Sequence, residues 1–162
     1  RASRPGPLLG LFGTDHPVMR GQLAGVDTHH LAIGEPDAAA VEHRLRTQGV
    51  AFFSVVLPPQ TSRADAAARI ALVLGDLVGG LGAPGTLVVA GGETLRGLCG
   101  VLGAERLDVV GEVMPGIPRS VLMGGRWSGV HVVSKSGAFG APDLLRTLLG
   151  DAAESPHRAL QP

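Results

Sequence analysis

Short apolar runs alternate along this chain with segments whose apolar residues recur at helical spacing. This alternation constrains the possible folds more than any other feature of the sequence. The apolar runs predict strands at 8–12, 29–33, 52–56, 86–90, 107–113, 120–123 and 130–134. Helical periodicity predicts helices at 15–24, 37–48, 63–81, 92–102 and 142–149. Strands that alternate with helices are typical of an α/β fold, and we expect a three-layer α/β sandwich with a mainly parallel sheet.

The length of the chain, 162 residues, suits one compact domain. We expect a flexible N-terminal segment over 1–7, a single α/β domain over 8–150 and a C-terminal tail over 151–162. The chain starts at Arg1 rather than at a methionine, which is compatible with a piece of a longer protein.

Composition and charge argue against nucleic-acid and membrane partners. Basic and acidic residues number 14 each, and aromatic residues make up only 3% of the chain, with no tyrosine. A nucleic-acid partner needs a positive footprint or base-stacking aromatics, so we expect none. No apolar run approaches the roughly 18 residues of a membrane span, and no secretory signal is visible. A cytoplasmic protein without a membrane partner is therefore expected.

The residue pattern does not predict a protein-bound metal. Cys99 is the only cysteine, which excludes an internal disulfide and a multi-cysteine zinc site. His29 and His30 are adjacent on a predicted strand, so their side chains point to opposite faces and cannot share a metal ion.

Residues 90–94, Ala-Gly-Gly-Glu-Thr, leave a buried-type strand and open a helix. Glycines such as Gly91 and Gly92 let a ligand approach the backbone, and the free amides and dipole of a helix start favour an anion. Thr94 adds a hydroxyl, and Glu93 can accept a hydrogen bond from a ribose hydroxyl. A tight strand–helix turn with an acidic first helical turn explains the same residues equally well, so both interpretations stay open.

A second strand-to-helix loop, rich in serine and glycine, follows the last predicted strand. Lys135 ends that strand, and Ser136, Gly137 and Gly140 follow it. Successive amides of such a loop can form an anion-binding nest, and the lysine can neutralise phosphate. A glycine-rich turn with one exposed lysine is the alternative. Together the two loops favour a phosphate-bearing ligand.

Three blocks of the second half resemble, in order and spacing, the C-terminal nucleotide-binding domain of the four-carbon acid-sugar kinases (the 3-oxo-tetronate, threonate and erythronate kinases). The family patterns are G-G-[DE]-T, an acidic residue before P-G-[VI]-P, and K-x-G-x-F-G-x-[PD]. The matching residues here are 91–94, Glu112 with 115–118, and 135–142. Near the start, 13–22 resembles the family's G-S-x-S-P-x-T-x-x-Q loop. Here Thr14 and His16 replace the two serines, and Met19 replaces the threonine.

The resemblance implies the ATP-binding domain of a kinase that phosphorylates a hydroxyl of a four-carbon sugar acid. It places ATP over Gly91 to Thr94 and Gly137, with a hydroxyl from Thr14 and the amine of Lys135 near the phosphates. Mg²⁺ would be carried mainly by the nucleotide. The family's N-terminal domain, which binds the acid sugar, has no counterpart in this chain. The resemblance therefore implies a sugar-acid-binding partner domain or subunit, and alone this chain should bind nucleotide without phosphorylating a sugar acid.

Other functions and partners stay open on the sequence. The altered residues His16 and Met19 would suit a non-catalytic regulatory or assembly module derived from the same domain. The glycine loops would also suit a domain that binds another anionic metabolite. A homo-oligomer is compatible with each of these functions.

Overall fold

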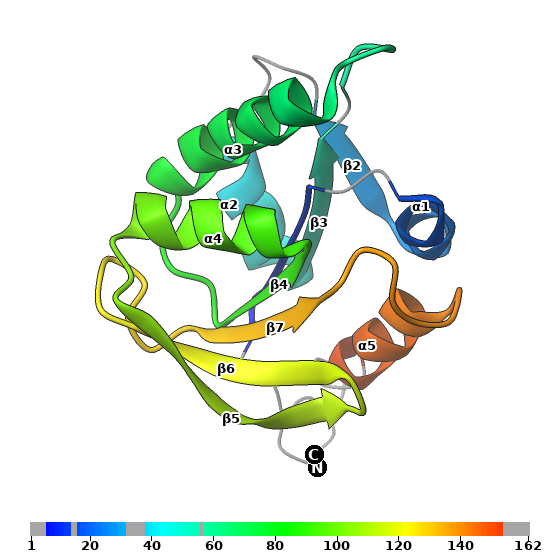
Figure 1. The fold of residues 1–162 in the computed structure, drawn as a ribbon. Coiled ribbons are helices and arrows are strands. Elements are labelled where there is room, and N and C mark those ends of the chain that lie inside the picture. Colours follow the sequence, from blue (N-terminus) through cyan, green and yellow to red (C-terminus); the bar gives the residue numbers. More distant parts are fainter. Residues whose placement is uncertain (1–5, 14–15, 32–37, 56, 154–162) are drawn as a thin grey trace.

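The computed structural model describes residues 6–13, 16–31, 38–55 and 57–153 (Figure 1). Thr14 lies outside these residues, as do the ends of the chain at 1–5 and 154–162. The strands are β1 (Leu8–Phe12), β2 (Thr28–Leu31), β3 (Val50–Val55), β4 (Thr86–Ala90), β5 (Arg106–Met114), β6 (Ile117–Met123) and β7 (His131–Lys135). The helices are α1 (Pro17–Ala24), α2 (Ala38–Gln48), α3 (Arg63–Gly79), α4 (Gly92–Leu102) and α5 (Leu144–Ala153).

The seven strands form one sheet in the order β2-β3-β1-β4-β7-β6-β5. Strands β2, β3, β1, β4 and β7 run parallel to one another. The β5–β6 hairpin extends the sheet in antiparallel fashion beside β7. The expected mainly parallel α/β fold is therefore confirmed.

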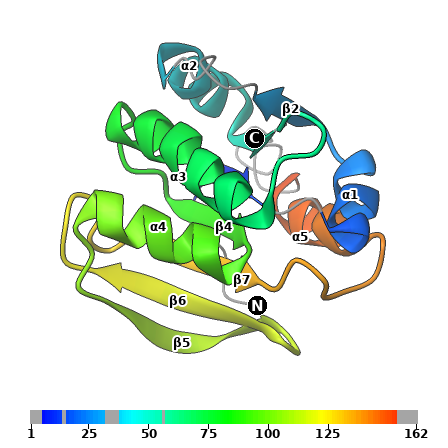
Figure 2. The same cartoon turned by 45° about the horizontal axis from the view of Figure 1, so that its top comes forward.

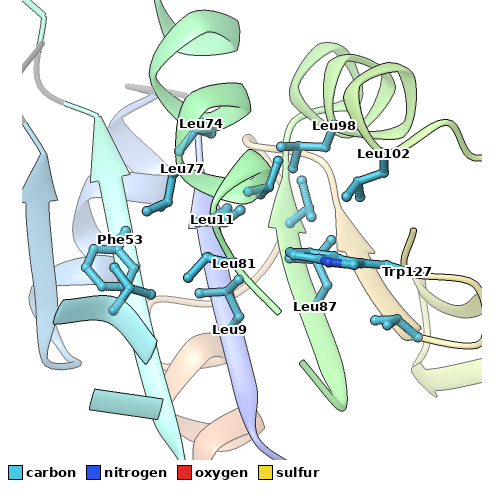
Figure 3. Packing of buried hydrophobic residues seen from close by; sticks show 14 of the residues in the cluster. Leu9, Leu11, Phe53, Leu74, Leu77, Leu81, Leu87, Leu98, Leu102 and Trp127 are labelled. Atoms are coloured by element: carbon cyan, nitrogen blue, oxygen red, sulfur yellow. The ribbon is translucent and has the colours of Figure 1, made fainter. Parts of the chain in front are cut away.

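Helices cover both faces of this sheet, which gives the three layers. Alternate residues of a strand point to opposite faces, and β1 shows the rule clearly. Leu9 and Leu11 pack beneath α2, α3 and α4, together with Leu74, Leu77 and Trp127 (Figure 3). Leu8 and Phe12 pack on the other face, against α1 and α5. Because β1 is buried on both faces, it reads as a continuous apolar run.

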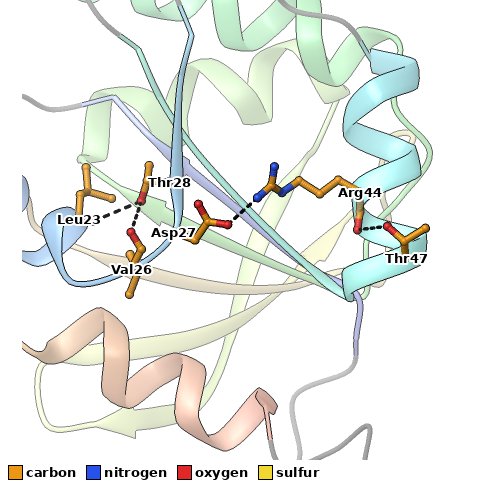
Figure 4. Close-up of polar contacts among 6 residues, drawn as sticks. All are labelled: Leu23, Val26, Asp27, Thr28, Arg44 and Thr47. Carbon is orange, nitrogen blue, oxygen red and sulfur yellow. Dashed lines mark hydrogen bonds and ion pairs between the residues drawn. The ribbon is translucent and has the colours of Figure 1, made fainter.

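The connection from α1 to β2 is fixed by local polar contacts (Figure 4). The Thr28 hydroxyl donates to the carbonyl oxygens of Leu23 and Val26 at 3.5 and 3.4 Å. Asp27 forms an ion pair of 2.6 Å with Arg44 of α2. These contacts set the direction in which the chain leaves α1, the helix that borders the cavity described below.

The parallel strands bring several strand-to-helix connections to one edge of the sheet. The carboxyl ends of β1, β3, β4 and β7 all lie there, because these strands share one direction. Strands β1 and β4 are neighbours, but the chain leaves β1 toward β2 and β3 and leaves β4 toward the opposite side of the sheet. Such a switch in direction opens a crevice between the helices that follow the two strands, α1 and α4, and open α/β sheets bind ligands in this crevice.

Candidate functional site

A cavity of about 1400 Å³ lies at this edge of the sheet. Its walls come from the start of α1, the connection between β3 and α3, the first turns of α3, and the start of α4. Figure 2 shows the N-terminal ends of α3 and α4 beside each other, with α1 across from them. The cavity therefore occupies the crevice that the strand order predicts.

The start of α4 forms one wall of the cavity. Gly91 precedes the helix at a φ of 97°, a conformation that favours glycine. Its amide donates to the carbonyl oxygen of Lys135 at 3.0 Å, which joins the end of β4 to the end of β7. A side chain on Gly92 would meet no atom within 4 Å, so its backbone is open to a ligand. The first amides of a helix have no partner inside the helix, and Gly92 and Glu93, which carry two of them, line the cavity.

Thr94 connects α4 to the end of β1. Its side chain is buried, and a Cβ atom added to Gly13 would collide with the Thr94 hydroxyl. Gly13 and Thr94 both line the cavity. The absence of a side chain at Gly13 therefore leaves room for Thr94. This allows the loop after β1 to lie against the start of α4.

Three arginines line the same cavity, and the sequence motifs include none of them. Arg20 lies on α1, Arg63 is the first residue of α3, and Arg96 lies on α4. All three are exposed. Glu93 is the acidic residue among the described lining residues, so within the described part of the chain the wall carries more positive than negative side chains. Because these arginines are far apart along the chain, no local sequence pattern includes them together. The strand order brings them to one cavity.

Lys135 lies away from the cavity, in the interior. Its side chain is only 5% exposed. The Nζ atom donates to the carbonyl oxygen of Ser136 at 2.6 Å and lies 3.5 Å from the Sδ atom of Met19. Burial lowers the pKa of this amine from 10.5 to about 8. The alternative of an exposed lysine in a turn is wrong, because the ammonium group is enclosed between α1 and the loop that follows β7.

The loop after β7 is held from two sides. Gln22, which is fully buried, donates from Nε2 to the carbonyl oxygens of Phe139 and Ala141, each at 3.0 Å. The Phe139 ring covers Gly116, the turn residue between β5 and β6. Glu112 accepts a hydrogen bond from the Gly116 amide at 3.4 Å. Gln22 of the first family block thus positions this loop directly, and Glu112 of the hairpin block holds the turn that the Phe139 ring contacts.

The predicted site residues accordingly fall into two groups. Gly91, Gly92, Glu93 and Thr94 line the cavity. Lys135, Ser136, Gly137 and Gly140 belong to the neighbouring loop and are not among the lining residues. His16 lies at the cavity and caps α1, accepting from the Val18 amide at 3.2 Å through Nδ1.

Within the described ranges, no group of three or more His, Cys, Asp or Glu residues could hold a metal ion. In the same part of the chain, no helix has the length and apolar character needed to cross a bilayer.

The fold and the cavity define an α/β domain with a crevice at a switch point of its sheet. Residues 39–145 match the family described as the nucleotide-binding C-terminal domain, and the chain belongs to that family. Two kinases are similar to it in sequence. A D-threonate kinase of Bordetella bronchiseptica is 28% identical, over 86% of this chain and 39% of its own length. A 3-oxo-tetronate kinase of Pseudomonas fluorescens is 31% identical, over 79% of this chain and 32% of its own length.

These relatives identify the domain as the C-terminal nucleotide-binding domain of the four-carbon acid-sugar kinase family, as its motifs predicted. The chain spans about a third to two fifths of the length of the two kinases.

Solved structures share the fold at low sequence identity. A Haemophilus influenzae protein superposes with a TM-score of 0.69 at 17% identity, over 93% of this chain and 41% of its own. A domain of unknown function from Bordetella bronchiseptica, described as a domain-swapped dimer with bound citrate, superposes with a TM-score of 0.67. It is 24% identical, and the match covers 90% of this chain and 41% of the related one.

Proposed function

We propose that this chain is the ATP-binding domain of a kinase that phosphorylates a four-carbon sugar acid. The observation that carries the proposal is the cavity at the switch point between β1 and β4, with the amides of Gly92 and Glu93 at its wall. Membership of the nucleotide-binding domain family supports a nucleotide as the ligand. The similarity to D-threonate and 3-oxo-tetronate kinases supports ATP as the phosphoryl donor and a sugar acid as the acceptor.

The residues of the cavity fit ATP in size and chemistry. The volume of about 1400 Å³ lies above the usual range for small-molecule sites, so a nucleotide can enter together with part of an acceptor. The open backbone at Gly92 admits a phosphate to the start of α4, where the helix dipole favours negative charge. Glu93 is exposed and can accept a hydrogen bond from a ribose hydroxyl. Bound ATP would supply the phosphoryl group, and these residues would hold and orient it.

Mg²⁺ in this proposal is held mainly by the phosphates of the nucleotide. Magnesium usually keeps several waters and is bound through substrate phosphates with one or two carboxylates. Among the described residues of the cavity wall, Glu93 is the acidic one, which is consistent with a metal ion that arrives with the nucleotide.

Transfer to a sugar acid needs donor and acceptor to be positioned together. Because this chain spans only part of the length of the related kinases, we assign acceptor binding to a separate sugar-acid-binding domain or subunit. The chain alone then binds nucleotide without phosphorylating a sugar acid. A cytoplasmic site of action belongs to the same proposal. The domain-swapped dimer of the related fold suggests a homo-oligomer as a further possibility to test by light scattering.

The test is a thermal-shift titration with ATP, with and without Mg²⁺, followed by calorimetry. A ligand at about 100 times its Kd stabilises the folded state by about 2.7 kcal/mol, which raises the midpoint by several degrees. Gly92→Val should weaken ATP at least tenfold, because it places a branched side chain against the phosphates. Gly100→Val is the matched control, since a side chain there also meets no atom within 4 Å but lies in the same helix outside the cavity. Equal affinity in both variants would contradict this location of the site.

One observation favours a second function, the non-catalytic module. Met19, which replaces the family's threonine, is fully buried and lies against Lys135, so the first loop offers no hydroxyl at that position. A chain that gives no thermal shift at millimolar ATP, alone or with an acid-sugar-binding partner, would support this module over the kinase.

A further inference from the structure

We propose that Arg20, Arg63 and Arg96, rather than Lys135, are the cationic groups that bind the phosphates in this cavity. The ligand class is a nucleoside di- or triphosphate, and the inference rests on the proposed nucleotide site. It assigns the phosphate contacts to three residues that the family motifs do not contain.

The three arginines reach one space from three different helices. Arg63 begins α3, Arg20 lies in the first turn of α1, and Arg96 lies in the second turn of α4. Each of these helices starts at the carboxyl edge of the sheet, and each arginine lines the same cavity. Three positive side chains from separate walls can surround a chain of phosphates, whereas a single lysine can contact it at one point.

These guanidinium groups are available to a ligand. Among the residues that the structure describes, none of the three forms an ion pair or a side-chain hydrogen bond. Other arginines of this chain are engaged: Arg44 pairs with Asp27, and Arg106 pairs with Asp108 at 2.9 Å. Unpaired positive charges that face one cavity raise the local concentration of anions. A guanidinium fork can also donate two parallel hydrogen bonds to the oxygens of one phosphate.

The amine of Lys135 has other partners. It donates to the Ser136 carbonyl oxygen, lies beside Met19, and is 5% exposed. To reach a ligand in the cavity, it would have to break the hydrogen bond of 2.6 Å and leave the interior. Its place in the fold is that of a structural group beneath the two glycine loops.

The test measures Kd by calorimetry for ATP, ADP, adenosine and inorganic triphosphate at fixed ionic strength. The variants are Arg20→Gln, Arg63→Gln, Arg96→Gln and Lys135→Met. Arg69→Gln is the control, because Arg69 is exposed on α3 and does not line the cavity. A charge-assisted hydrogen bond contributes enough that each cavity variant should weaken ATP and triphosphate by roughly tenfold or more. Adenosine should bind the variants as it binds the wild type. Arg69→Gln and Lys135→Met should leave the Kd of all four ligands within about twofold of the wild-type value. Arg63→Lys should restore part of the affinity that Arg63→Gln loses.

Each outcome decides the inference. If ATP binds the wild type but the three cavity variants keep their affinity, or if Lys135→Met alone loses it, the arginine assignment is wrong while the nucleotide site stands. If inorganic triphosphate binds through the arginines, but the adenine base adds no affinity in either adenosine or ADP, the arginine assignment holds and the nucleotide proposal fails. If the wild type binds none of the four ligands, both are wrong.

Discussion

Replacing the buried Lys135 with methionine should remove an alkaline rise in stability that we expect of the wild-type chain. The amine is enclosed between Met19 and the Ser136 carbonyl oxygen, and burial lowers its pKa from 10.5 to about 8. Methionine has a similar length and no charge, so Lys135→Met keeps the volume and removes the titration.

The size and sign of the effect follow from linkage. Between about pH 8 and 10.5 the folded lysine is neutral while the unfolded lysine still holds its proton, so unfolding takes up a proton and the free energy of unfolding rises with pH. At about 1.4 kcal/mol for each pH unit, the gain across this window is about 3 kcal/mol. Below pH 8 both states carry the charge, and the folded chain bears the full cost of burying it.

One other group in the described residues has a shifted pKa near this window, and it acts in the opposite direction. Burial raises the pKa of the Cys99 thiol above 9.0, so the unfolded chain loses that proton first and stability falls with rising pH. The wild type and Lys135→Met should therefore be compared with Cys99→Ala present in both. The sequence contains a single lysine and no tyrosine, so no other lysine or tyrosine side chain titrates in this alkaline range.

The assay is urea unfolding between pH 7 and 10.5, followed by the fluorescence of Trp127, the single and buried tryptophan. We expect the stability advantage of Lys135→Met over the wild type to shrink by about 3 kcal/mol across this range. Lys135→Arg should show a flat alkaline curve at low stability, because arginine stays charged. A wild-type curve that is flat in the Cys99→Ala background would refute the reasoning, since the ammonium group would then be as well solvated in the folded chain as in the unfolded one.

Two further predictions concern the loops around the cavity. Gln22→Leu should lower the free energy of unfolding by about 2 kcal/mol, because the carbonyl oxygens of Phe139 and Ala141 lose their donor; a loss below about 0.5 kcal/mol in urea unfolding would mean that the loop is held by other contacts. Gly13→Ala should cost about 1–3 kcal/mol through its collision with Thr94 and should also weaken ATP. Thr94→Ala should relieve part of that stability loss, and strictly additive losses in a double-mutant cycle would contradict the contact.

Most of the fold could be predicted from the sequence because its elements have local signals. Apolar periodicity located each helix and strand to within a few residues. Ser62 caps α3, accepting from the Asp65 amide at 3.2 Å. The helix ends at Gly79 rather than at the predicted Leu81, because two successive glycines interrupt it while Leu81 remains buried. The order of the strands has no local signal, since it depends on contacts between distant segments.

The candidate site divides in the same way. Gly91, Gly92 and Thr94 could be found because a strand, two glycines and a helix start follow one another directly. The positions of Lys135 and the three cavity arginines could not be found, because they depend on which helices face the same space. A lysine at a strand end satisfies a local pattern whether its amine faces a ligand or the interior, and only the packing of Met19 against it decides between them.

The position of β7 in the sheet has a consequence for the order in which the chain can fold. β7 is the last strand in sequence but lies between β4 and β6, so it joins the parallel block to the β5–β6 hairpin. Until residues 131–135 emerge from the ribosome, the hairpin has no strand of the main sheet to pair with, and β4 has a free edge. We expect a nascent chain that stops before β7 to expose both edges, which are the surfaces that lead to aggregation. The two glycine loops also meet only when β7 docks, through the hydrogen bond from Gly91 to Lys135, so we expect ligand binding only after β7 has docked.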